Sequence, residues 1–119
     1  MAMKLCNLDY LKSVTPKSNA FAIQMIKLFL QDTPVAVKNI NDALKNQNWL
    51  EVHKNAHKIK PSVIMLGVPQ RLIDSLLAIV EHAKTENETH KIARHLFNFE
   101  EGMTKVYKEL EEAIEEMEN

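Results

Sequence analysis

Apolar residues recur at steps of three and four along nearly the whole chain, and this spacing predicts helices. The clearest stripe runs through the middle of the sequence and comprises Trp49, Val52, Ala56, Ile59, Val63 and Leu66. The strict alternation of apolar and polar residues that marks a half-buried strand is absent. The pattern therefore predicts an all-α protein.

Prolines, glycines and capping residues divide this pattern into six predicted helices, at about 7–14, 18–31, 34–46, 48–66, 69–84 and 88–117. Ser18 is placed to cap the second helix, Thr33 with Pro34 forms a cap and first-turn proline, and the fourth helix begins at Asn48. Gly67 ends the fourth helix. Short connections favour antiparallel neighbours, so we expect the third to sixth helices to form an antiparallel four-helix bundle. Two additional N-terminal helices would then cover one end of this bundle.

The predicted inner faces follow from the same spacing. They comprise Phe21, Met25, Leu28 and Phe29, then Val37, Ile40 and Leu44, then Leu72, Ile73, Leu76, Leu77 and Val80, and finally Leu96, Phe99, Met103, Val106, Leu110, Ile114 and Met117. The acidic stretch 109–118 is interpreted as a solvated face, and Cys6 as part of a frayed terminus. We expect residues 1–119 to form a single domain.

His57 lies on the helix that carries the central stripe, but it does not belong to the stripe. Advancing each residue by roughly 100° places His57 about 130° from the centre of the stripe, on the solvent side. Lys54 and Lys60 lie one turn away on either side. Pro61 and Ile64 share the sector of His57, which indicates a partly exposed apolar patch around it. Such a patch is typical of a docking surface around a reactive group.

Composition narrows the possible functions. The 15 basic and 16 acidic residues nearly cancel, so net charge indicates neither nucleic acid nor membrane as a partner. The single cysteine, Cys6, excludes an internal disulfide and suits a reducing, cytoplasmic compartment. No apolar run is long enough to span a bilayer, and no secretory signal is present. Two glycines, Gly67 and Gly102, cannot form a phosphate-binding loop, which excludes the usual routes to ATP binding.

The segment Ala56-His57-Lys58-Ile59-Lys60-Pro61-Ser62, with Gly67 ten residues past the histidine, resembles the histidine-containing phosphotransfer (HPt) domain of bacterial two-component phosphorelays. The predicted bundle extends this resemblance over nearly the whole chain. One departure concerns Pro61, because the family often has glycine there, which clears space for a phosphoryl group. Proline also removes a helical hydrogen bond to the carbonyl of His57.

The resemblance implies a phosphoryl carrier that is not an enzyme. His57 would accept a phosphoryl group from a phospho-aspartate in a receiver domain and donate it to another receiver. The implied partners are a response-regulator receiver domain and a hybrid histidine kinase, with Mg²⁺ in the partner and no cofactor in this chain, which we expect to be monomeric. Three lysines are expected to assist His57, with Lys60 as the principal cation and Lys54 and Lys58 as weaker ones. Pro61 and Ile64 would form the docking patch, and Gly67 would allow close approach of the fourth and fifth helices. Gln70 and Arg71, early in the fifth helix, are further candidates for the site.

Two other functions remain open at this point. The first is a non-catalytic helical adaptor that binds a partner protein through the exposed apolar patch. The second is a small metal-binding bundle that uses His53 and His57, which lie four residues apart on one helix face. Zinc needs further ligands, and Lys54 and Lys60 would repel a dication, so we predict no metal site. His82, His90 and His95 show no ligand spacing.

Overall fold

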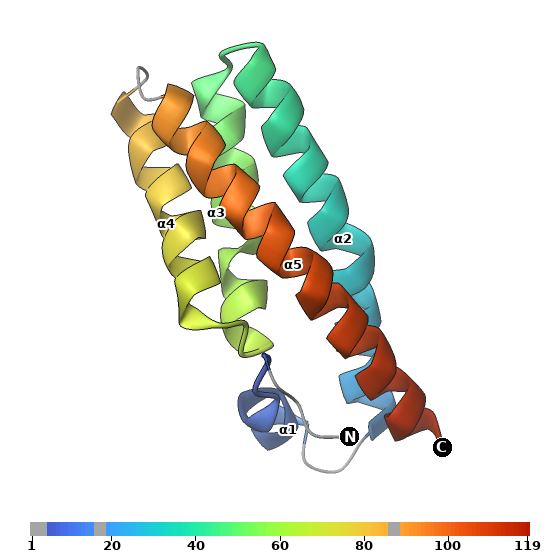
Figure 1. Cartoon of the computed structure of the whole chain (residues 1–119). Helices are drawn as coiled ribbons and strands as arrows, with labels where there is room; N and C mark the ends of the chain where they lie inside the picture. Colours follow the sequence, from blue (N-terminus) through green and yellow to red (C-terminus); the bar gives the residue numbers. More distant parts are fainter. Residues whose placement is uncertain (1–4, 16–18, 86–88) are drawn as a thin grey trace.

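The computed structural model describes residues 5–15, 19–85 and 89–119, and within these ranges it contains five helices and no strand. They are α1 (Asp9–Val14), α2 (Asn19–Lys45), α3 (Trp49–Met65), α4 (Gln70–Thr85) and α5 (Thr89–Glu118). Helices α2 to α5 form an elongated bundle, and α1 lies across one end of it, near the C-terminus (Figure 1). The molecule measures 48 × 21 × 20 Å along its principal axes. The predicted all-α bundle is confirmed.

The second and third predicted helices are one continuous helix, α2, so the predicted break at Thr33 and Pro34 is wrong. Only one short N-terminal helix, α1, supplements the bundle. The buried positions of α2 continue in phase through the proline, from Phe29 to Thr33 and Val37. Pro34 itself is exposed, and it lacks only the N–H that would bond to the carbonyl four residues earlier. The predicted cap at Ser18 and the predicted start at Glu88 lie outside the described residues.

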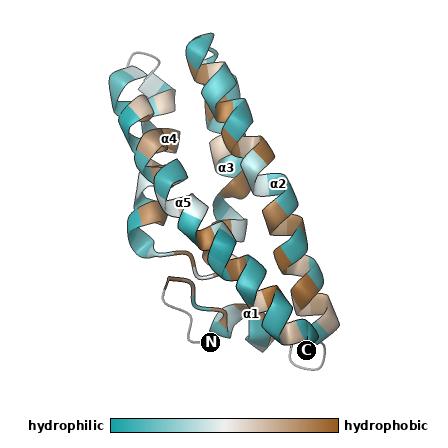
Figure 2. Cartoon of the chain, turned by 45° about the vertical axis from the view of Figure 1, so that its right-hand side comes forward, coloured by the Kyte–Doolittle hydropathy of each residue, from teal (hydrophilic) through white to brown (hydrophobic). Residues whose placement is uncertain are grey.

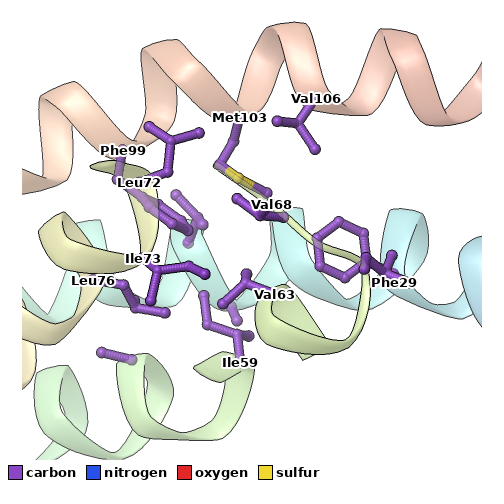
Figure 3. Close-up of a cluster of buried hydrophobic side chains, with 14 of the residues drawn as sticks. Phe29, Ile59, Val63, Val68, Leu72, Ile73, Leu76, Phe99, Met103 and Val106 are labelled. Carbon is purple, nitrogen blue, oxygen red and sulfur yellow. The ribbon is translucent and has the colours of Figure 1, made fainter. Parts of the chain in front are cut away.

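The core is shared by α2, α3, α4 and α5, and its residues approach one another from all four helices (Figure 3). Apolar and polar residues alternate around each helix, as expected for amphipathic helices (Figure 2). Phe21 and Leu28, predicted to point inward, are 50% and 45% exposed because the inner face of α2 is formed by Ala22, Ile26 and Phe29. Leu77 and Met117 are only partly buried, and the other predicted core positions on α4 and α5 are confirmed.

Helix α3 begins and ends at the predicted residues, and both of its ends are capped. The Asn48 side chain accepts a hydrogen bond from the backbone N–H of Glu51 at 3.2 Å. After α3, Gly67 adopts φ +61°, and the N–H of Val68 donates to the carbonyl of Val63 at 3.1 Å. The Gly67 N–H donates to the carbonyl of Ile64, which completes a Schellman motif. These caps fix the length and rotation of the helix that carries His57.

The N-terminal segment is held against the bundle, contrary to the prediction of a frayed terminus. The backbone N–H groups of Leu5 and Cys6 donate to the Glu109 carboxylate at 2.8–3.1 Å. Glu109 is therefore partly buried and bonded, and its interpretation as a solvated acid is wrong. Burial, and secondarily the Glu109 charge, raise the pKa of the Cys6 thiol to about 12. Cys6 is thus a protonated core residue rather than a reactive thiol.

Candidate functional site

One exposed face of α3 carries an imidazole between two apolar side chains. Leu50, His57 and Ile64 are separated by seven residues each, so they form a line along the helix, with successive members roughly 10 Å apart. Leu50 and Ile64 are 76% and 50% exposed, and the predicted exposure of His57 is confirmed. Lys54 and Pro61 are exposed on the same face. Sequence reasoning missed Leu50, although its seven-residue spacing from His57 could have identified it.

Three lysines surround this face. Lys54 is exposed beside His57, Lys58 lies on the side of α3 that faces α2, and Lys60 is half-buried. Among the residues that the structure describes, none of these lysines forms an ion pair. The acidic residue of α3, Glu51, lies in its first turn and bonds to Asn55. The middle of α3 therefore presents uncompensated positive charge, which favours an anionic group.

The ring of His57 stacks on the ring of His53, one turn earlier. The ring centroids are 5.8 Å apart, and the ring planes are inclined by 17°. His53 is half-buried because it also lines a shallow groove between α3 and α4 with Trp49 and Ala83. The inner ring is therefore supported by the bundle, while His57 is the outer, solvent-facing member of the pair.

A second groove, of about 220 Å³, runs between α2 and α3 beside the exposed face. Lys58 and Ser62 border it on α3, and Asp32 and Leu28 border it on α2. Its other lining residues are mainly apolar: Met25, Phe29, Thr33, Ile59, Met65 and Leu66. This groove extends the apolar surface next to His57 onto α2.

Pro61 lies inside α3, and the helix continues past it to Met65. Because proline has no N–H, the carbonyl of His57 lacks its usual helical partner. Pro61 is exposed, so this carbonyl is on the solvent side of the helix. The helix that presents His57 thus remains continuous with proline at position 61.

The contacts of three further predicted site residues, Gly67, Gln70 and Arg71, are to other parts of the structure. The backbone closest to Gly67 is that of Asn7, whose N–H donates to the Gly67 carbonyl at 3.0 Å. The absence of a side chain at Gly67 therefore allows the N-terminal segment to pack against the end of α3. The predicted role of Gly67 in the close approach of α3 and α4 stays a prediction. Gln70 bonds to Asp74 on its own helix at 2.9 Å. Arg71 lines a groove between α4 and α5 with Lys105.

A second histidine pair joins α4 to α5, and no spacing in the sequence predicted it. The rings of His82 and His95 stack with centroids 5.7 Å apart. Burial, and then the charges of His82 and Arg94, lower the pKa of His95. Across residues 5–15, 19–85 and 89–119, no three His, Cys, Asp or Glu side chains converge on a common metal position. No helix in these ranges is both long and apolar enough to cross a membrane.

Comparison with known proteins gives one informative result. No family model and no curated protein sequence matches the chain. Among solved structures, the chain is similar to histidine-containing phosphotransfer protein B (HptB) from Pseudomonas aeruginosa PAO1, with a TM-score of 0.85. The two share 14% sequence identity over 97% of this chain and 98% of HptB. The chain therefore has the fold of a histidine-containing phosphotransfer protein over nearly its whole length.

Proposed function

We propose that this chain is a phosphorelay intermediate, which accepts a phosphoryl group on His57 from a phospho-aspartate in one receiver domain and passes it to another. The observation that carries the proposal is an exposed imidazole on a lysine-rich helix face of an HPt-like bundle. The partners would be a response-regulator receiver domain and a hybrid histidine kinase. The receiver would supply Mg²⁺ and the acidic pocket, so this chain acts as a carrier rather than an enzyme.

The transfer needs little from the carrier beyond a nucleophile and a positive surface. A ring nitrogen of neutral His57 attacks phosphorus, the bond between phosphorus and the aspartyl oxygen breaks, and the aspartate leaves as a carboxylate. The proton on the other ring nitrogen is released to water, which leaves a dianionic phosphoryl group on the imidazole. Lys54 and Lys60 are near enough in the helix to stabilise that charge. The reverse reaction delivers the phosphoryl group to the next receiver.

The direct test is transfer from a phosphorylated receiver. Receiver domains from the same genome are phosphorylated with acetyl phosphate and Mg²⁺, freed of donor, and mixed with this chain. We expect phosphate to move to this chain within minutes, as a modification that is labile in acid and stable in base. A chain that binds receivers but never acquires such phosphate would instead be a helical adaptor, the alternative function that exposed Leu50 and Ile64 also support.

Replacement of Ile64 by aspartate tests the docking patch. Ile64 is 50% exposed, so the substitution should leave the bundle folded. It removes apolar contact area and sets a carboxylate against the acidic pocket of the receiver, so we expect receiver affinity to fall roughly tenfold. Phe97→Asp, on α5 and 67% exposed, is the matched control and should leave affinity unchanged. Equal losses in both variants, or an unfolded Ile64→Asp protein by circular dichroism, would refute this role.

Replacement of Lys60 by alanine tests the principal cation. A charge-assisted hydrogen bond contributes roughly 1.5–3 kcal/mol before screening, and partial exposure of Lys60 reduces this to about 1 kcal/mol. We therefore expect transfer to His57, or the lifetime of its phosphoryl group, to fall roughly three- to tenfold. The measurement is the decay of labelled phosphate after the receiver is removed. Lys105→Ala, in the groove between α4 and α5, is the control and should behave as wild type. Unchanged kinetics in Lys60→Ala would show that Lys60 has no role in phosphoryl transfer.

A further inference from the structure

The stacked imidazoles of α3 place a second titratable ring beside the proposed phosphoryl acceptor. The centroids of His53 and His57 are 5.8 Å apart with planes inclined by 17°, so the two rings face each other in nearly parallel planes. A phosphoryl group is bulkier than the ring nitrogen that carries it, and its oxygens project beyond the edge of the ring. On His57 these oxygens would therefore lie close to the neighbouring ring of His53, so a positive charge on that ring would attract them.

The surroundings of His53 hold its ring in place. It lines the groove between α3 and α4 with Trp49, Leu50, Ala83 and Lys84, and it is half-buried there, whereas His57 is exposed. A ring packed in this way loses little freedom when it binds the phosphoryl group. The charged groups that bear on it are Lys84 from α4, which is paired with Glu81 at 3.2 Å, and His57 and Lys54 from α3 itself.

We propose that His53 is a positioning residue for the phosphoryl group on His57, and that it acts in its protonated form. This inference rests on the proposed phosphotransfer function and extends it to a residue outside the HPt-like segment. An imidazolium at His53 attracts the negatively charged phosphoryl group and favours a position beside its own ring. Arrival of the dianion thus promotes proton uptake by His53 from water.

The consequence is a dependence of phosphoryl lifetime on pH. The contribution of His53 requires the protonated form of its ring, so it is present at low pH and is lost as the pH rises. Phosphohistidine itself hydrolyses faster in acid, and this background is common to wild type and variants. The contribution of His53 is therefore read from the ratio of wild-type to variant lifetimes and not from either lifetime alone.

The experiment measures the lifetime of labelled phosphate on the full chain between pH 5.5 and 8.5 after transfer from a phosphorylated receiver. We expect the wild-type lifetime to exceed that of His53→Gln about three- to tenfold at pH 6 and to equal it at pH 8.5. His53→Arg, which keeps a charge at every pH, should restore the long lifetime and retain it at pH 8.5. His90→Gln, an exposed histidine on α5, is the matched control and should follow wild type throughout.

The outcomes separate this inference from the function on which it rests. If no chain acquires phosphate from any receiver, the proposed function fails. If His57 is phosphorylated in every variant and the ratio of lifetimes stays at one across the pH range, the function stands and the role of His53 is refuted. A loss in His53→Gln that is the same at every pH and is not restored by His53→Arg would show a packing effect, and it would also refute the proposal.

Discussion

His57→Gln should abolish phosphoryl uptake from a phosphorylated receiver, with a loss of more than a hundredfold in the rate of labelling. Glutamine approximates the size and polarity of histidine, but its amide nitrogen has no available lone pair for attack on phosphorus. His57 is exposed, and its ring contact within the described structure is the stack on His53. We therefore expect the melting temperature of His57→Gln to stay within about 2 °C of wild type, because substitutions of this kind change stability by roughly 0.5 kcal/mol or less.

The matched control is His53→Gln, which removes the other ring of the same stack. It should still acquire phosphate, and the two variants together show that the acceptor is the outer ring. Labelled protein is digested under basic conditions and the modified peptide is located by mass spectrometry. Phosphate that persists in His57→Gln, and that maps to another histidine such as His82 or His95, would overturn the proposed site. Full binding of the receiver with no label in wild type would favour the adaptor.

Sequence reasoning succeeded for α3 because three independent local signals agree there. The apolar stripe fixes the rotation of the helix, Asn48 fixes its start, and Gly67 fixes its end. The exposure of His57 follows from these three features alone. The boundary at Pro34 was wrong because a proline fits both a first helical turn and a solvent-facing interior position. The buried face that continues through Thr33 shows that Pro34 lies inside a helix and not in its first turn. Burial is a property of the assembled bundle, so the sequence alone could not decide between these two positions.

The contacts that sequence could not predict are those between distant segments. Leu5 and Cys6 bond to Glu109, more than a hundred residues later. Glu109 belongs to a run of acidic residues, and no local signal separates it from its solvated neighbours. The pairing of His82 with His95 likewise depends on how α4 and α5 align. Within α3, by contrast, the stacking of His53 on His57 follows from their four-residue spacing.

Gly67→Ala should destabilise the fold by about 3 kcal/mol or more, a larger loss than we expect from any surface substitution. Two costs add at this position. The backbone at Gly67 has φ +61°, which costs an L-residue roughly 1–2 kcal/mol. An added Cβ would also lie 1.9 Å from the carbonyl oxygen of Asn7, so the N-terminal segment would have to move. That movement breaks the hydrogen bond from Asn7 to Gly67 and uncovers the buried residues Cys6 and Leu8.

Urea unfolding followed by circular dichroism measures this loss, and two variants separate its causes. Asparagine tolerates positive φ, so Gly67→Asn relieves part of the backbone strain but retains the clash with Asn7. If the clash dominates, Gly67→Asn should be nearly as unstable as Gly67→Ala. Gly102→Ala is the contrasting glycine, because its Cβ would meet side-chain atoms of Leu72 rather than backbone. A side chain can shift where a backbone carbonyl cannot, so Gly102→Ala should lose less stability than Gly67→Ala. A Gly67→Ala protein whose free energy of unfolding is within 1 kcal/mol of wild type would show that residues 5–8 do not hold the end of the bundle.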